Sequence, residues 1–211
     1  MVVPVEKTAQ NWLWLDFSAQ NTELSKFDLG NIAEMNDYVF GQIAAAGAQA
    51  GVGGYNEDRA VYQKSPVFQS SLGARSIHLG VDIWMPAFTL VCSPLAARVH
   101  SFRDNANFGD YGPTLILEHQ LEGTVFFTLY GHLSRASLRD VSPGQNIAKG
   151  QKIGEIGPET ENGQWTPHLH FQIIQDMQGH EGDFPGVAHR QESAFYLNLC
   201  PDPNLMLGIP R

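Results

Sequence analysis

From about residue 55 onward, hydrophobic residues occur in short runs that glycine and proline interrupt. The runs are rich in Val, Ile, Phe and Thr, and each is about five to seven residues long, which is typical of antiparallel β strands. The pattern therefore predicts an antiparallel β body. The predicted strands lie at 79–85, 97–102, 113–119, 124–130, 152–156 and 168–174.

The N-terminal quarter of the chain follows a different pattern. An apolar run at 12–17 predicts one strand, and apolar positions that recur at helical spacing predict an amphipathic helix over 32–46. The stretch 44–54 is composed mostly of Ala and Gly, which predicts a flexible connection that ends the helix. We therefore expect an N-terminal segment at 1–54 and a main domain at 55–211.

The later part of the chain contains one hairpin signal and two segments with little regular structure. The Gly-Gln pairs at 144–145 and 150–151 resemble the hairpins of small half-barrel sheets. The polar stretch 176–192 predicts a long loop, and the proline-rich tail from residue 200 predicts no regular structure. The expected fold is mainly β, an antiparallel sheet or half-barrel with an open groove and an N-terminal helical appendage.

Charge and composition restrict the function. The 211 residues include 13 Lys and Arg against 22 Asp and Glu, so the net charge is −9, and a nucleic-acid partner is not expected. No apolar run approaches the roughly 20 residues of a membrane span, and no signal peptide is recognisable. A cytoplasmic protein is expected, or a periplasmic or extracellular one if the chain is a fragment or is exported by another route. Oligomeric state stays open.

Four of the eight histidines fall in three local patterns that suggest a metal or acid–base site. His168 and His170 are two positions apart in a predicted strand, so their side chains share a face. His78 and Asp82 likewise share a face of an extended segment, and the glycine between them removes a side chain that would crowd an ion. The third pattern places His132 at the end of a predicted strand.

The other histidines and the two cysteines are not expected to form a site. His100 and Asp104 have the same spacing as His78 and Asp82 but no glycine between them, and they are expected on a solvated face. The remaining histidines, His119, His180 and His189, are expected at the surface. Cys92 and Cys200 are expected to be free thiols, because their separation fits neither a zinc motif nor a disulfide framework.

Taken in chain order, the three histidine patterns closely resemble the signature of the lysostaphin-type zinc metallopeptidases, family M23. The patterns are His-x-Gly-x-Asp at 78–82, Tyr-Gly-His-Leu at 130–133 and Pro-His-Leu-His-Phe at 167–171. The Gly-Gln pairs within 144–151 match the family's usual approach to its last motif. The resemblance covers 75–176.

A closer likeness links the chain to a subgroup of bacterial M23 domains, some of which are fused to aminotransferase and kinase-like domains. It rests on the segments 161–168, 183–187 and 201–204.

Carried over residue by residue, the resemblance implies that His78, Asp82 and His170 bind one zinc ion per chain. It also implies that His132 and His168 lie beside the metal as catalytic residues. Two neutral imidazoles and one carboxylate leave an open fourth position, as catalytic zinc sites require. One of the two catalytic histidines would act as general base and the other as a hydrogen-bond or proton donor, and the sequence leaves open which does which.

Further contacts to the substrate or metal are expected from flanking residues. Tyr130 is expected to share the face of His132, where it either contacts the substrate or packs in the core, and Trp165 is expected either to form a wall of the groove or to serve packing alone. In some members of the family an upstream segment supplies a fourth metal ligand. Asn56, Glu57 or Asp58 is the candidate for that ligand here, and an ordinary loop is the alternative.

The leading hypothesis is a zinc endopeptidase that hydrolyses peptide amide bonds in peptidoglycan cross-bridges or stem peptides. A cytosolic peptide or amide hydrolase, and a non-catalytic or regulatory M23-like binding module, are the alternatives. Two histidines and one carboxylate also form the facial triad of non-haem iron oxygenases. That hypothesis is weaker, because those sites generally separate the first histidine and the carboxylate by one residue, and it leaves His132 and His168 without a role.

Overall fold

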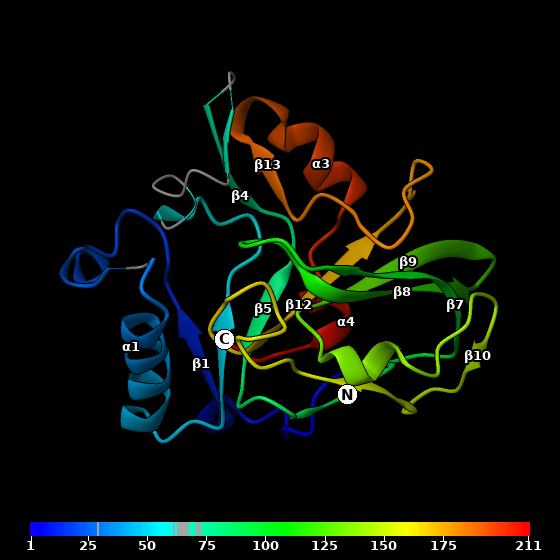
Figure 1. The fold of residues 1–211 in the computed structure, drawn as a ribbon, viewed down its shortest axis with the longest axis horizontal. Helices are drawn as coiled ribbons and strands as arrows, with labels where there is room; N and C mark the ends of the chain where they lie inside the picture. The colour runs from blue at the N-terminus through cyan, green and yellow to red at the C-terminus, as the bar shows by residue number, and fades with distance from the viewer. Residues whose placement is uncertain (29, 61, 63–67, 71–72) are drawn as a thin grey trace.

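The computed structural model describes residues 1–28, 30–60, 62, 68–70 and 73–211, and its architecture is mainly β (Figure 1). Eight strands form one large sheet in the order β1-β2-β5-β12-β9-β8-β7-β10, and all of its described pairings are antiparallel except β1 with β2. The expected mainly β, antiparallel fold is therefore confirmed. The strands of this sheet are β1 (Trp12–Leu15), β2 (Ala50–Gly53), β5 (Val81–Trp84), β7 (Ala97–Asn105), β8 (Gly112–Leu121), β9 (Thr124–Gly131), β10 (Asn146–Ile147) and β12 (His168–Ile174).

Two smaller sheets and several short helices complete the fold. One small sheet pairs β6 (Leu90–Cys92) with β11 (Lys152–Glu155), and the other contains β3 (Gln69–Ser70), β4 (Gly73–His78) and β13 (Val187–His189). The helices are η1 (Ala9–Asn11), η2 (Thr22–Lys26), α1 (Ile32–Ala45), η4 (Arg135–Leu138), η5 (Arg190–Glu192), α3 (Ser193–Leu199) and α4 (Asn204–Leu207). Within the described ranges, no helix combines the length and the apolar character that crossing a membrane demands.

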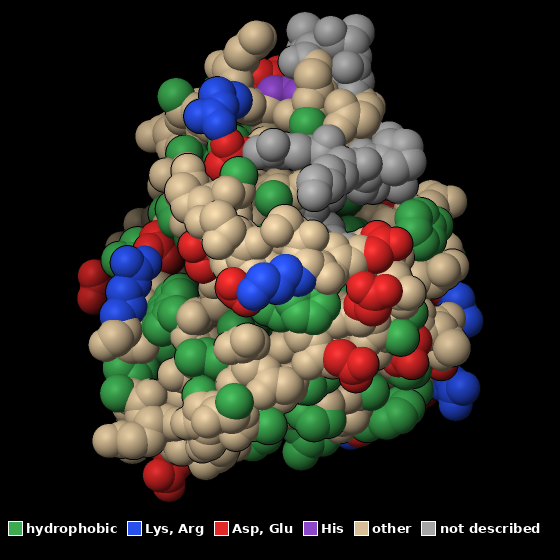
Figure 2. Space-filling model, turned by 90° about the vertical axis from the view of Figure 1, so that its left-hand side faces the viewer, with side chains coloured by type: hydrophobic (Ala, Val, Ile, Leu, Met, Phe, Trp, Pro, Cys, Tyr) green, Lys and Arg blue, Asp and Glu red, His purple; other side chains and the backbone are tan. Residues whose placement is uncertain are grey.

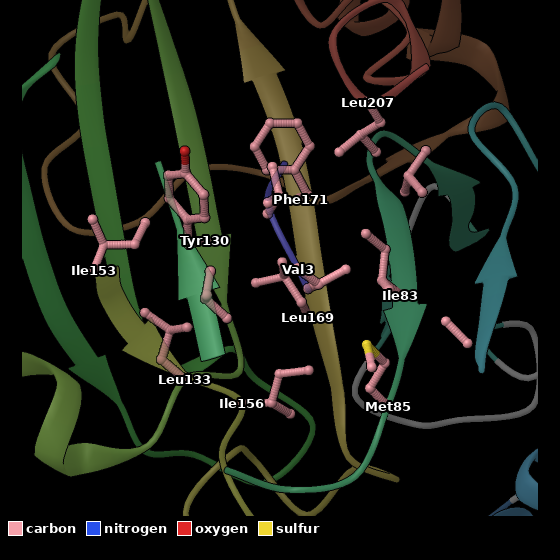
Figure 3. Close-up of a cluster of buried hydrophobic side chains, with 14 of the residues drawn as sticks. Val3, Ile83, Met85, Tyr130, Leu133, Ile153, Ile156, Leu169, Phe171 and Leu207 are labelled. Atoms are coloured by element: carbon pink, nitrogen blue, oxygen red, sulfur yellow. The ribbon is translucent and has the colours of Figure 1, made fainter. Parts of the chain in front are cut away.

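Strand alternation in β12 separates the core from the polar site. Leu169, Phe171 and Ile173 point into the main hydrophobic core, where Phe171 packs against Tyr130 of β9 (Figure 3). The intervening side chains project to the opposite face of the same strand, and they remain buried although they are polar. These polar side chains are His168, His170 and Gln172.

The N-terminal segment extends the main sheet. β2 pairs with β5 through Val52 opposite Ile83, and α1 packs over this end of the sheet, where its Ile43 joins a cluster with Trp84 of β5 (Figure 1). The predicted helix is confirmed, and Asn31 caps its N-terminus by accepting hydrogen bonds from the backbone N–H groups of Ala33 and Glu34. The boundary at residue 54 stays a prediction.

The stretch 44–54 is not simply the flexible connection that its composition predicts, because Ala50–Gly53 form the fully buried strand β2. A Cβ at Gly51 would lie 2.9 Å from side-chain carbons of both Ile43 and Leu15. Small residues are therefore required in β2, because this strand packs closely against both α1 and β1. A local pattern of Ala and Gly does not reveal this packing.

Two predictions for the C-terminal part are also corrected. The expected loop 176–192 contains β13, which pairs with β4, and the tail contains the short helix α4. The pairing of β13 is long-range, so the polar sequence around it hides the strand. α4 follows Pro203, where the missing N–H costs no helical hydrogen bond, and it ends at Gly208 in the left-handed conformation.

The face of the molecule that carries α1 is shown in Figure 2. A group of Asp and Glu side chains gathers on it, with Lys and Arg scattered around them. This surface agrees with the net charge of −9.

Candidate metal centre and active site

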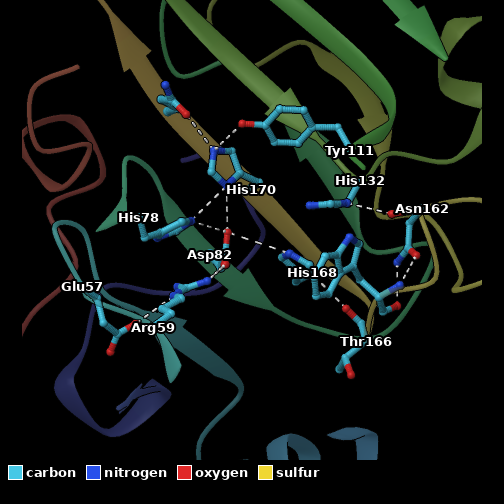
Figure 4. A network of polar contacts seen from close by, with 12 residues as sticks. Glu57, Arg59, His78, Asp82, Tyr111, His132, Asn162, Thr166, His168 and His170 are labelled. Atoms are coloured by element: carbon cyan, nitrogen blue, oxygen red, sulfur yellow. Dashed lines mark hydrogen bonds and ion pairs between the residues drawn. The ribbon is translucent and has the colours of Figure 1, made fainter. Parts of the chain in front are cut away.

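Three strands bring His78, Asp82 and His170 together (Figure 4). His78 ends β4, Asp82 lies in β5, and His170 of β12 is directly opposite Asp82 in the antiparallel register. The Nε2 atom of His78 is 3.1 Å from Nδ1 of His170 and 3.3 Å from Oδ1 of Asp82, and the latter two atoms are 3.0 Å apart. All three residues are buried.

These three donors fit a zinc ion. Zinc ligand distances of about 2.0–2.1 Å place tetrahedral ligand atoms about 3.3 Å from one another, close to the three separations observed. Two imidazole nitrogens and one carboxylate oxygen are also a donor set that zinc accepts. Gly80 lies against the site, since a Cβ there would be 2.5 Å from Cε1 of His170.

Hydrogen bonds fix which nitrogen of each imidazole faces the donor cluster. Nδ1 of His78 donates a hydrogen bond to the carbonyl oxygen of Gly54, at 2.9 Å. The lone pair on Nε2 is therefore free to bind a metal ion. Nε2 of His170 donates to Oε1 of Gln172, at 2.9 Å, and lies 3.4 Å from the hydroxyl of Tyr111. Such partners orient metal-binding histidines and set their tautomers.

Asp82 is held as a carboxylate by its surroundings. Burial disfavours its charge, but the neighbouring His78 and Arg59 hold its pKa well below the ordinary value. Burial lowers the pKa of His78 to about 4, with Arg59 acting in the same direction. Asp82 and His78 are therefore in the deprotonated forms that metal binding requires at neutral pH.

His132 and His168 lie beside the three donors. Their Nδ1 atoms donate to the backbone carbonyl oxygens of Asn162 and Thr166, at 2.8 and 2.7 Å, so each Nε2 carries a free lone pair. Burial lowers the pKa of both imidazoles, and His168 lowers that of His132 further. Nε2 of His168 is 3.9 Å from Oδ1 of Asp82.

A cavity of about 420 Å³ opens onto this cluster. Trp165 lines it, as expected for a groove wall, and its indole N–H donates to the carbonyl oxygen of Asp110 at 3.1 Å. Tyr62 and Phe68 pack with Trp165 on the same side. The cavity thus has an aromatic wall and is lined by five histidines, the four of the site and the exposed His180.

The structure places Tyr130 in the core, the packing alternative of the two, and not at the site, which corrects the expected shared face with His132. Its side chain is fully buried in the core, and its hydroxyl accepts a hydrogen bond from Thr128. The expectation assumed that the strand continues to His132. β9 ends at Gly131 and His132 has a φ of 61°, so the two side chains do not share a face.

The upstream acidic residues face other partners. The carboxylate of Glu57 accepts from the backbone N–H of Phe17 and from Nε of Arg59, both at 2.9 Å. The carboxylate of Asp58 accepts from Ser76 and forms an ion pair with Arg190. Neither carboxylate joins the donor cluster found among the described residues, and a metal contact from Asn56 stays a prediction.

The histidines outside the site are only partly where the sequence places them. His180 is exposed, whereas His119 and His189 are buried, which corrects the surface assignment of both. In the core, His119 is hydrogen-bonded to the carbonyl oxygen of Ala96 and to the hydroxyl of Thr128, and it stacks on Phe126.

Three further residues contact the site, and sequence reasoning did not identify them. Gln172 follows His170 by two positions in the same strand, so alternation alone could have found it. Arg59 and Tyr111 reach the site from segments far apart in the sequence, and no local pattern marks them.

Comparison with known proteins gives one family and several structural matches. A model described as Peptidase family M23 matches residues 76–182. A search among curated proteins finds no match.

Three solved structures illustrate the structural matches. A putative peptidase M23 from Pseudomonas aeruginosa has 24% identity and a TM-score of 0.42, with 64% of this chain and 45% of that chain covered. A zinc-containing peptidase from Vibrio cholerae has 32% identity and a TM-score of 0.39, with 53% and 30% covered. The catalytic domain of lysostaphin from Staphylococcus simulans has 24% identity and a TM-score of 0.39, with 57% and 80% covered. The chain thus spans less than half the length of the first two proteins.

Proposed function

The chain belongs to peptidase family M23, and on that premise we propose that it is a zinc-dependent endopeptidase. Its proposed substrates are peptide amide bonds in peptidoglycan cross-bridges or stem peptides, a substrate class that the family resemblance suggests. The observation that carries the proposal is a cavity lined by His78 and His170, which cluster with Asp82 as a group that could hold a metal ion, and by the two neutral imidazoles of His132 and His168.

We propose that His78, Asp82 and His170 hold the metal. A zinc ion bound there supplies a Lewis acid and lowers the pKa of a bound water to about 7. The carboxylate and two neutral imidazoles contribute one negative charge, and the three side chains come from different strands of a rigid framework. Such a framework keeps the donors in place without a large ordering cost.

His132 and His168 are the proposed catalytic residues. Each presents an unprotonated Nε2, so either can accept a proton from the attacking water. The imidazolium formed in that step can then donate the proton to the leaving amine through the same Nε2, because Nδ1 stays bound to a backbone carbonyl. Their rings lie close enough that a second proton on the pair is disfavoured.

Trp165 is proposed to contact the substrate as part of the aromatic wall. A cavity of about 420 Å³ is within the usual size of ligand sites, which are roughly 300–1,000 Å³. It is large enough for the side chains next to one scissile bond, while the rest of a longer peptide would extend outside it.

The proposal is tested by digesting purified muropeptides and a panel of short peptides with the zinc-loaded chain, with and without a chelator. Chelator-sensitive cleavage of muropeptides is the expected result. Cleavage of the short peptides alone would replace the peptidoglycan assignment with a peptide hydrolase of another kind. Absence of any cleavage by a chain that binds zinc would contradict the endopeptidase function.

A further inference from the structure

Arg59 is a buried cation next to the donor cluster. Its side chain is 3% exposed, and its Nη1 donates to Oδ2 of Asp82 at 2.5 Å (Figure 4). This is the oxygen of Asp82 that does not face His78 and His170, whose donor atoms lie within 3.3 Å of Oδ1. The two carboxylate oxygens of Asp82 therefore have different partners.

The guanidinium is held from several sides. Its Nε donates to Glu57 and its Nη1 also donates to the hydroxyl of Tyr62. The aromatic rings of Phe17, Tyr62 and Trp84 surround it, with their centroids 5.5–5.8 Å from its central carbon. Paired and enclosed in this way, the guanidinium has little freedom to leave Asp82.

The N-terminal part of the chain is shaped to admit this side chain. A Cβ at Gly53 of β2 would lie 2.5 Å from Nη2 of Arg59 and 2.4 Å from the ring of Trp84. Phe17 packs on Trp84 at 4.8 Å between centroids, and Trp84 in turn stacks on His168 at 5.6 Å. Residues from the N-terminal segment thus pack against the same group of side chains as the site.

An arginine buried only to stabilise the fold would add little to the free energy of unfolding. Removing an ion pair from water generally costs about as much as the attraction returns, so such pairs are weak evidence of stabilisation. A carboxylate that ligates a metal, in contrast, needs an outer partner to fix its orientation. Arg59 meets that need, because its Nη1 binds one oxygen of Asp82, while Nε of the same planar group is held by Glu57, and the other oxygen of Asp82 is left for the donor cluster.

We propose that Arg59 is a positioning residue, which holds Oδ2 of Asp82 so that Oδ1 alone faces the metal. This role rests on the proposed metal site, and it makes the segment that precedes the family motifs part of that site. It acts through Asp82 and needs no contact between Arg59 and the substrate.

The test measures zinc affinity by competition with a chromophoric chelator in the full chain. Arg59→Met is expected to lose about 10- to 100-fold in affinity, the usual effect of removing an outer partner of a metal ligand. Arg59→Lys keeps a donor for Oδ2 without the planar fork, and it is expected to recover part of this loss while remaining several-fold weaker than the parent. The absorption spectrum of the cobalt-loaded Arg59→Met chain should also differ from that of the parent, because Asp82 is free to change its coordination.

The matched control is Arg98→Met, because Arg98 forms an exposed ion pair with Glu118 on β7 and β8. It should keep parental zinc affinity and cobalt absorption. Circular dichroism checks the fold of every variant. If Arg59→Met fails to fold, the Glu57→Gln/Arg59→Met double variant takes its place, with the same expected loss, because it removes the half-buried negative charge of Glu57 together with the buried positive charge. If that variant also fails, the several-fold loss expected for Arg59→Lys becomes the deciding measurement.

Each outcome decides the role. A folded Arg59 variant with parental affinity and an unchanged cobalt spectrum would overturn it, as would an equal loss in Arg98→Met. Failure of the parent chain to bind zinc would instead overturn the metal site itself and, with it, this role. If the parent chain binds zinc but hydrolyses no peptide, the proposed enzyme activity is contradicted. The zinc affinities of the Arg59 variants would still support the positioning role.

Discussion

The imidazole rings of His132 and His168 lie 4.2 Å apart, centroid to centroid, and each is tethered through Nδ1 to a backbone carbonyl. This arrangement keeps both Nε2 atoms unprotonated and close to the donor cluster. Because the rings are buried together, protonation of one disfavours protonation of the other. The pair is therefore suited to accept one proton and then pass it on.

His132→Ala and His168→Ala are each expected to lower hydrolysis by about 10²- to 10⁴-fold, the usual contribution of a positioned acid or base. Zinc content should stay at one ion per chain, since neither side chain belongs to the donor cluster. Peptide cleavage rates and metal analysis of the purified variants check both statements.

The control for these variants is His100→Ala, which removes a histidine that contacts Ser101 and Phe127 away from the site. It should keep parental rates. Hydrolysis that persists when both His132 and His168 are replaced would rule out the proposed mechanism.

His78→Ala, Asp82→Ala and His170→Ala are each expected to abolish stoichiometric zinc binding, because two remaining donors do not hold the ion. Activity should fall with the metal content. The matched control is the His100→Ala/Asp104→Asn double variant, which disrupts the same sequence spacing at a place where no donor cluster is found among the described residues. Equal zinc loss in that control would contradict the assigned ligands.

The shared faces of the candidate site residues could be predicted because they depend on local rules, whereas the division into metal ligands and catalytic residues came from the family resemblance. Alternation in an extended strand places His168 and His170 on one face, and the structure keeps both on β12. Alternation failed for Tyr130 because β9 ends one residue before His132, and strand ends depend on long-range pairing.

The outer partners of the site could not be predicted in this way. Arg59 reaches Asp82 only because β2 is a buried strand beside β5, and the Ala and Gly composition of β2 hides it. The segment around Arg59 did attract attention as a source of a fourth ligand. Its carboxylates instead bind Phe17, Arg59 and Ser76, and the arginine is the residue that approaches the donor cluster.

Gly80→Ala is expected to weaken zinc binding and to destabilise the chain by about 1–3 kcal/mol, the usual cost of overpacking. A Cβ at this position would lie 2.5–2.6 Å from two ring atoms of His170 and 2.9 Å from the carbonyl oxygen of Phe171. Thermal unfolding and zinc competition measure the two effects.

Gly41→Ala provides the opposite outcome as a control, because Gly41 is exposed in α1 and a Cβ there would meet nothing within 4 Å. This variant should be more stable by about 0.5–1 kcal/mol and should bind zinc normally. Normal zinc affinity and stability in Gly80→Ala would show that the site tolerates the added carbon.

Gln172→Met removes the acceptor for Nε2 of His170 while keeping the length of the side chain. Zinc affinity is expected to fall by about 10-fold, because the imidazole loses the partner that fixes its tautomer. Gln175→Met, at an exposed position after the same strand, is the control and should bind zinc like the parent. Equal affinities in the two variants would remove Gln172 from the site.

Without metal, the free energy of unfolding is expected to fall as the pH drops below about 6.5. Burial lowers the pKa of His78 to about 4 and also lowers those of His132 and His168, whereas all three titrate near 6.5 in the unfolded chain. Below that pH the unfolded chain binds more protons than the folded chain, so each histidine contributes about 1.4 kcal/mol per pH unit until its folded pKa is reached. Asp82 is ionised in both states over this window, so it adds little to the slope.

Urea unfolding in chelator at pH 7.5, 6.5 and 5.5 measures this pH dependence of the free energy of unfolding. His132→Gln should reduce the slope by about the contribution of one histidine. A free energy that stays constant between pH 6.5 and 5.5 would contradict the burial of neutral imidazoles on which the proposed proton transfer depends.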